Sequence, residues 1–329
     1  MDSYMAEKTN RNLLLKDKLY AYTGLTFAVA FWAANTVLAR GVVKEINPMA
    51  LSFWRWFVAL ILILPFGFMH IKIEMHEIRK NKLRLSILSF FSVTVYNSVL
   101  YEAAHFTTAT NMSIATATLP AITIVMAWLV INDIPSRLQI AGIFISALGM
   151  VTISFMGSFE NIYRLKFSYG DLMVIGSMTS WSLYSVLLRK FDIKIHPISL
   201  LTITIGLGVL FIFPFYFWEI IITRKLSLGH HAISVFLFTG IFPSILAYFF
   251  WNNGVAKVGP STSAMFLYLL PVFSAYLSVT FLGEEIRLFH IFGGMLIFIG
   301  LSLAVQKRHL NYPFKDSLPS EKAPPTTRK

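Results

Sequence analysis

The chain is a series of long apolar runs separated by short polar segments. Leu19–Ala39 has no charged residue over 21 positions, enough for a helix to cross a hydrocarbon core of about 30 Å. Continuous apolar runs without alternation predict transmembrane helices instead of barrel strands, because a bilayer offers backbone groups no partner. Nine further runs follow and centre on residues 49–69, 84–102, 109–131, 138–156, 171–188, 198–218, 232–252, 261–282 and 289–305.

The ten runs fall into two repeats. An offset of 149 residues relates Trp32 to Trp181, Arg40 to Arg189, Pro48 to Pro197 and Pro65 to Pro214. An offset of 151 relates Pro120 to Pro271, Asp133 to Glu284, Gly142 to Gly293 and Gly149 to Gly300. Self-similarity of this kind predicts two five-helix repeats, in residues 20–156 and 171–305. Because five is odd, the repeats lie in the membrane with opposite orientations, as in many secondary transporters.

The repeated glycines have a spacing with a structural meaning. Gly142 and Gly149 are seven residues apart, as are Gly293 and Gly300, so each pair lies on one face of its helix. Small residues on one face let neighbouring helices approach closely in a membrane. We therefore expect a tight helix contact there.

Composition supports an integral membrane protein. The chain is 56% hydrophobic and 13% charged, whereas soluble proteins contain about 25% charged residues. It has no cysteine, which excludes disulfides and thiolate metal ligands. The net charge of +12 has a simpler explanation in the positive-inside rule than in nucleic-acid binding.

The distribution of Lys and Arg predicts the orientation. With the N-terminus in the cytoplasm, 20 of the 28 basic residues lie on the cytoplasmic side and 7 outside, and Arg55 lies within a span. Both termini are therefore expected in the cytoplasm. Residues 1–19 then form a cytoplasmic segment, and the Lys- and Pro-rich residues 306–329 form a disordered cytoplasmic tail.

Several segments resemble the EamA-type ten-helix branch of the drug/metabolite transporter superfamily. They are FWAANTVLAR, NPMALSFWRWFVALILILP, GDLMVIGSMTSWSLYSVLLRK and the closing GIFPS, LGEE and GGMLIFIG segments. Asn132 and Asp133 stand where the family usually has Gly-Glu, so we expect a less regular turn there.

The resemblance implies an all-α transporter of small molecules in the inner membrane, working by alternating access without a cofactor. Export of amino-acid-like or drug-like solutes is the first reading. Import of a host-derived, nucleotide-like cofactor such as S-adenosylmethionine is the alternative. The expected partners are the solute and the lipid bilayer, with no nucleic acid, and a second copy of the chain in a homodimer is a further candidate.

An intramembrane enzyme is the rival class. His76 and Glu77 begin like a zinc-binding helix, but the second histidine is missing. Neither a Gly-x-Ser-x-Gly motif nor paired aspartates for prenyl diphosphate chemistry occurs. The sequence therefore favours a transporter and predicts no catalytic residue and no metal.

Arg55 is the candidate with the most specific pattern. Its counterpart at an offset of 149 is Thr204, so the repeated fold does not require an arginine there. Charged residues within spans usually face the protein interior or a wet cavity. Alternatively, the long side chain snorkels to the membrane surface. The first reading predicts that Arg55 binds a polar or anionic group of the solute.

Other polar and aromatic residues within spans are candidates for lining a central cavity. Pro120 and Pro271 predict helix kinks at matching positions, which in transporters often mark the binding site. Tryptophan and tyrosine also form interfacial belts, and Tyr276 is another residue of this kind. The cavity candidates besides Arg55 are Trp32, Asn35, Tyr96, Asn97, Trp181, Tyr184, Tyr248, Trp251, Asn252 and Tyr268.

Overall fold

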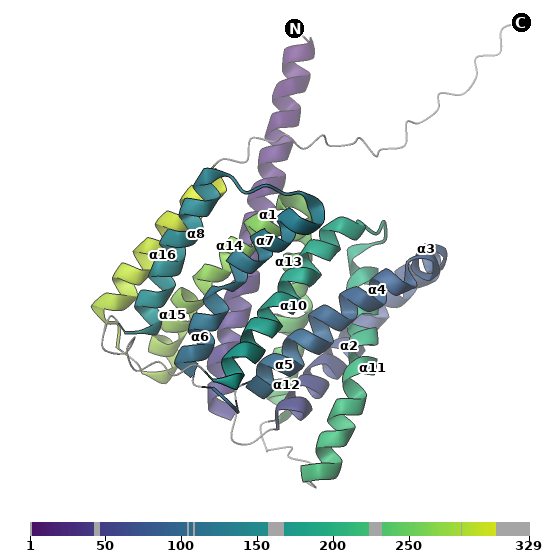
Figure 1. Cartoon of the computed structure of the whole chain (residues 1–329). Coiled ribbons are helices and arrows are strands. Elements are labelled where there is room, and N and C mark those ends of the chain that lie inside the picture. Colours follow the sequence, from purple (N-terminus) through teal and green to yellow (C-terminus); the bar gives the residue numbers. More distant parts are fainter. Residues whose placement is uncertain are drawn as a thin grey trace, which may run out of the picture.

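The computed structural model describes residues 2–42, 47–103, 105–107, 109–156, 168–223, 232–283 and 285–306, and these contain helices and no strand (Figure 1). The predicted tail beyond Gln306 and Glu284 of the second repeat lie outside the described residues. The first helix begins at Asp2 and so includes most of the predicted N-terminal segment.

The helices of the first half follow the predicted runs. They are α1 (Asp2–Val42), α2 (Pro48–Ile73), α3 (Met75–Lys80), α4 (Lys82–Ser89), the π-helix η1 (Phe90–Val95), α5 (Tyr96–Ala103), α6 (Ala109–Ala117), α7 (Leu119–Ile131) and α8 (Arg137–Ser154). Those of the second half are α10 (Tyr169–Phe191), α11 (Pro197–Thr223), α12 (Ala232–Gly240), the π-helix η2 (Ile241–Leu246), α13 (Ala247–Val258), α14 (Pro260–Met265), the 3-10 helix η3 (Phe266–Leu269), α15 (Leu270–Leu282) and α16 (Leu288–Gln306).

In the described part of the chain, nine helical stretches are long and apolar enough to cross a membrane, and Ala115–Ile131 is a shorter tenth. The prolines explain why the shorter one is interrupted. Pro120 is the second residue of α7, directly after a break at Thr118, and Pro271 is the second residue of α15, directly after η3. Proline suits the first turn of a helix because the N–H groups of that turn have no acceptor within the helix, so the lack of an N–H costs no hydrogen bond.

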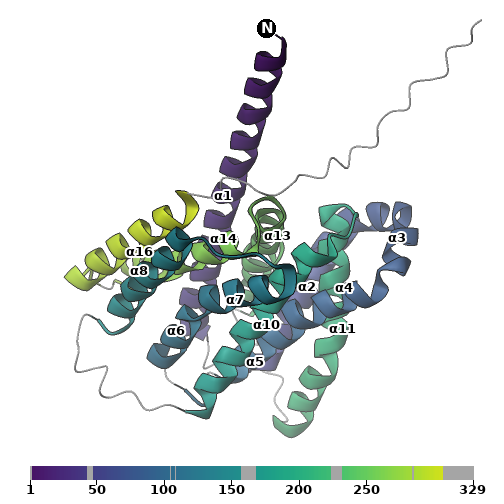
Figure 2. The same cartoon turned by 45° about the horizontal axis from the view of Figure 1, so that its top comes forward.

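Helices α8 and α16 pack side by side through the four glycines, as the sequence predicts (Figures 1 and 2). A Cβ on Gly149 would lie 2.5 Å from the carbonyl oxygen of Gly293. A Cβ on Gly300 would likewise lie 2.5 Å from the carbonyl oxygen of Gly142. An offset of 151 residues relates Gly149 to Gly300 and Gly142 to Gly293, so the two contacts are equivalent. The residue number rises along α8 while that of its partner falls along α16, so the two helices are antiparallel. A two-fold axis across the helices therefore relates the halves, which confirms inverted repeats.

Helices α2 and α11 form a second reciprocal pair. The rings of Phe53 and Tyr216 stack with centroids 4.5 Å apart, and a Cβ on Gly67 would meet the side chain of Thr202. Phe53 and Thr202 are repeat counterparts at an offset of 149 residues, as are Gly67 and Tyr216. The repeat therefore relates the contact between Phe53 and Tyr216 to the contact between Thr202 and Gly67. The same axis thus relates both helix pairs.

The first helix of each half packs mainly against the other half. Helix α1 lies against α13 and α15, and α10 lies against α5 and α7 (Figure 1). Close approach is needed here as well, since a Cβ on Gly254 of α13 would overlap Leu25 of α1 at 2.5 Å. Because the first helix of each half packs against the other half, α1, α5, α10 and α13 come together in the centre of the protein.

The turns after α7 and α15 have equivalent geometry. Asn132 has φ 54° and Gly283 has φ 68°, and each ends its helix in the left-handed conformation. Asparagine tolerates this region better than other residues with a Cβ. The expectation of a less regular turn at Asn132 is therefore wrong.

Replacing Gly283 by alanine should lower the free energy of unfolding by about 1 kcal/mol, because a residue with a Cβ is strained in the left-handed backbone conformation. Apart from its chain neighbours, no atom of the described residues lies within 4 Å of a Cβ built on Gly283, so the expected effect comes from the backbone conformation. Gly176 is the matched control, since a Cβ there would also meet no atom of another described residue and the glycine lies inside α10. Alanine there should stabilise the helix by about 1 kcal/mol. Thermal unfolding in detergent compares the two variants, and equal effects would contradict the prediction.

Candidate functional site

An aromatic cluster fills the space where the four central helices meet. Its centre is Trp181 of α10, which is 2% exposed and whose ring centroid lies 4.7–5.5 Å from five other rings. Trp56 of α2 joins the cluster through a T-shaped contact with Tyr248 at 4.9 Å. The members of the aromatic cluster are Trp32, Trp56, Tyr96, Trp181, Tyr184, Tyr248 and Trp251.

The cluster lies beside the pseudo-two-fold axis. Trp32 and Trp181 are repeat counterparts, and their rings meet at right angles with centroids 5.3 Å apart. Asn97 and Tyr248 are also counterparts, and the amide of Asn97 donates to the hydroxyl of Tyr248 at 3.4 Å. Equivalent residues touch only where the axis passes between them. Both halves therefore contribute to one central site.

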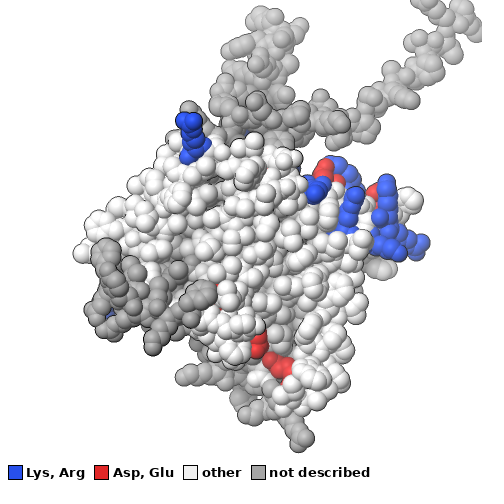
Figure 3. Space-filling view, viewed as in Figure 1, with Lys and Arg blue, Asp and Glu red and all other residues white. Residues whose placement is uncertain are grey.

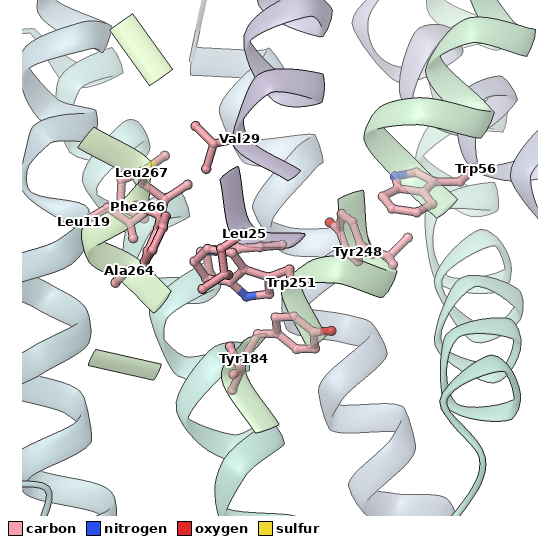
Figure 4. Packing of buried hydrophobic residues seen from close by; sticks show 14 of the residues in the cluster. Leu25, Val29, Trp56, Leu119, Tyr184, Tyr248, Trp251, Ala264, Phe266 and Leu267 are labelled. Atoms are coloured by element: carbon pink, nitrogen blue, oxygen red, sulfur yellow. The ribbon is translucent and has the colours of Figure 1, made fainter. Parts of the chain in front are cut away.

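Hydrogen bonds fix the orientation of several rings. The hydroxyl of Tyr184 donates to Oδ1 of Asn252 at 2.5 Å, and Nε1 of Trp251 donates to Oγ of Ser185 at 3.1 Å. These bonds join α10 to α13. Tyr184, Tyr248 and Trp251 lie close together in Figure 4, and each is at most 1% exposed. In this structure the three rings are therefore closed to solvent.

Arg55 of α2 lies next to the cluster and is 3% exposed, so its side chain does not snorkel to the surface. Its guanidinium donates to Oγ of Ser244 at 2.6 Å and to the carbonyl oxygen of Pro243 at 3.1 Å, both in η2. It also donates to the hydroxyl of Tyr101 at 2.9 Å and to Oδ1 of Asn97 at 3.4 Å, both in α5. Arg55 thus joins η2 of the second half to α5 of the first.

The two π-helices occupy equivalent positions, because adding 151 to the residue numbers of η1 gives those of η2. The carbonyl oxygen of Ser92 accepts from Tyr248 at 2.9 Å and from Asn97 at 3.0 Å. Its counterpart, the carbonyl oxygen of Pro243, accepts from Trp32 at 3.0 Å and from Arg55. Short π-helices are frequent at functional sites. Here they direct one backbone acceptor from each half toward the centre.

Sequence reasoning missed these two acceptors. Pro243 lies inside an apolar run and disturbs the helix, because its ring clashes with the preceding turn. It was therefore a usable signal for η2. No comparable residue marks η1, where Ser92 stands at the equivalent position and its hydroxyl donates to the carbonyl of Leu88.

The structure brings most of the sequence candidates together, but not all. Asn35 is half-buried and has no described contact with the cluster. Tyr268 is buried apart from the cluster, and its hydroxyl donates to the carbonyl of Ala117 beside the break before Pro120. Tyr276 is 64% exposed on α15 and therefore belongs to the lipid-facing surface. The cavity role of the clustered residues stays a prediction, as does the functional meaning of the breaks at Pro120 and Pro271.

The two acidic residues that are buried in the described structure are bound by groups outside the aromatic cluster. Buried Asp133 accepts from Ser261, and buried Asp171 accepts from Thr107, Asn111 and the backbone N–H of Ser168. Within the described residues, His, Asp and Glu form no group of three or more that is placed to hold a metal ion. The arrangement is therefore an aromatic and polar site with one guanidinium.

Comparison with known proteins identifies the family. The model of the EamA-like transporter family matches the chain twice, over residues 19–155 and 168–306. The chain belongs to the EamA-like transporter family. The two matches coincide with the two halves of the structure, so this chain is a multi-pass membrane transporter.

Relatives in this family agree with that assignment. The chain is 27% identical over 277 residues to the uncharacterized transporter YyaM of Bacillus subtilis, covering 83% of this chain and 90% of the relative. It is 26% identical over 285 residues to an uncharacterized transporter of Archaeoglobus fulgidus, covering 87% and 97%. A WAT1-related protein of Arabidopsis thaliana is 24% identical over 286 residues, covering 78% and 76%.

One solved crystal structure has the same fold, with a TM-score of 0.69 at 16% identity, over 88% of this chain and 96% of the other.

Proposed function

We propose that this EamA-like transporter carries small solutes across the cytoplasmic membrane by alternating access, with the aromatic cluster as the solute site. The observation that carries the proposal is the contact between repeat counterparts at the centre, Trp32 with Trp181 and Asn97 with Tyr248. Transporters built from inverted repeats bind their solutes at the interface of the repeats near the bilayer midplane. Rocking of the halves about the axis would open this site to either side in turn.

We take export of amino-acid-like or drug-like solutes as the direction. Aromatic rings and a few oriented polar groups suit solutes that have an apolar body and a polar end. The test is purified protein in liposomes loaded with a mixture of metabolites. The expected result is protein-dependent efflux of a subset of solutes, recovered chemically unchanged. Recovery of a modified solute would favour an enzyme, and absence of movement for every solute would refute transport.

We propose further that both termini lie in the cytoplasm. In Figure 3 most of the visible Lys and Arg side chains gather at the end of the molecule from which α1 begins, chiefly around α3 and α4, where a few acidic side chains lie among them, and further acidic side chains show at the opposite end. Basic residues of this kind favour the cytoplasmic side. A reporter fused after Leu310 should therefore be active only in its cytoplasmic form. A fusion that is active only outside the cell would contradict this orientation.

A further inference from the structure

The guanidinium of Arg55 has no carboxylate partner in the described structure. Arg55 is the only Lys or Arg among the buried described residues. The buried carboxylates of Asp133 and Asp171 bind Ser261 and Thr107 instead. A buried charge without a counter-charge is costly, and neutral hydrogen-bond acceptors offset only part of that cost. The central site therefore carries an excess positive charge.

The same site has unused hydrogen-bond donors. Nε1 of Trp56 and Nε1 of Trp181 are buried, and neither has an acceptor among the residues that the structure describes. Both indole rings contact Tyr248, at 4.9 and 5.1 Å. The guanidinium carbon of Arg55 lies 4.9 Å from the centre of the Trp56 ring. Buried N–H groups without acceptors are rare in native proteins, and here two occur in the aromatic cluster, one of them on the ring next to Arg55.

We infer that the transported solute carries a carboxylate and that Arg55 binds it, which rests on the proposed function. A carboxylate supplies the negative charge and the acceptors that the site lacks, and it matches the planar guanidinium in a bidentate pair. The site favours a carboxylate over a phosphate dianion, because it contains one buried cation. The surrounding rings then hold the apolar body of the acid.

Binding of the acid also changes the contacts of Arg55. Four of its five N–H groups already donate, to Ser244, Pro243, Tyr101 and Asn97. A carboxylate that bridges Nη1 and Nη2 therefore takes at least one donor from a present partner. The bond to Asn97 is the longest, at 3.4 Å, and is the first to be replaced. The acid thereby loosens the link between α2 and α5.

The test compares acids with their own amides. Thermal unfolding of the purified full-length protein is measured with phenylacetate, 3-phenylpropionate and N-acetylphenylalanine, and with the corresponding carboxamides. Acids are expected to raise the Tm of the wild type, whereas the amides, which have the same shape without charge, should not. In Arg55→Gln and Arg55→Lys, the acid concentration for half-maximal stabilisation should rise about tenfold or more.

Two further variants separate recognition from folding. Arg287→Gln removes the same charge at an exposed position and should respond to acids like the wild type. Trp181→Phe keeps a ring but removes the N–H, and it should respond more weakly to acids. Amides as effective as acids, an unchanged response of Arg55→Gln, or no stabilisation by any acid would overturn the inference. Liposome transport of neutral or cationic solutes would in that event leave the proposed function standing, whereas no transport at all would refute both.

Discussion

Gly293→Ala should prevent stable packing of α8 against α16, whereas Gly294→Ala should be tolerated. A Cβ on Gly293 would lie 2.5 Å from Cγ1 of Ile153 and 2.7 Å from the carbonyl oxygen of Gly149. The backbone oxygen cannot move without shifting helix α8. Transmembrane helices associate largely through such close packing, so the shift removes contacts along the whole pair. We expect a loss of about 3 kcal/mol or more in the free energy of unfolding.

Gly294 is a control on the neighbouring position of the same helix. A Cβ built there would have Val272 as its nearest neighbour, at 4.0 Å, which is an ordinary contact. The measurements are the yield of monodisperse protein in detergent and its Tm. Equal yields and melting temperatures for the two variants would show that the glycine contact does not hold the halves together.

Trp181→Ala should abolish transport and strongly destabilise the protein. Its ring touches five others, and its removal leaves a large hole between α1, α5, α10 and α13. Truncation of a buried tryptophan costs about 3–5 kcal/mol. Any variant protein that folds has lost the ring that connects the two halves at the axis. Solute efflux from liposomes, normalised to folded protein, measures the effect.

Trp128→Ala is the matched substitution on the outside of the protein. Trp128 is 52% exposed on α7, so its removal leaves no internal hole. Transport and Tm should stay close to those of the wild type. A similar loss in both variants would mean that the effect reflects general sensitivity to tryptophan removal and would contradict a central role for Trp181.

The sequence by itself determined the helices, their division into halves and the glycine contact. A segment in a bilayer must satisfy its backbone hydrogen bonds internally, so run length and apolarity are sufficient to place a helix. The offsets of 149 and 151 residues then relate the halves, and an odd number of spans inverts one of them. The spacing of Gly149 from Gly142 indicated the contact face before any partner helix was known.

The tertiary structure decided which polar and aromatic residues meet. Trp181 and Tyr276 both lie in apolar runs, yet one is buried at the axis and the other is exposed. Within a continuously apolar run, composition does not distinguish the face toward lipid from the face toward protein. The partners of Arg55 are distant in sequence, and two of them lie in η2, whose position Pro243 signals but whose contact with Arg55 the sequence does not indicate. These contacts form only when the two halves pack together, because the first half supplies the Arg55 donors and the second half supplies acceptors on Ser244 and Pro243.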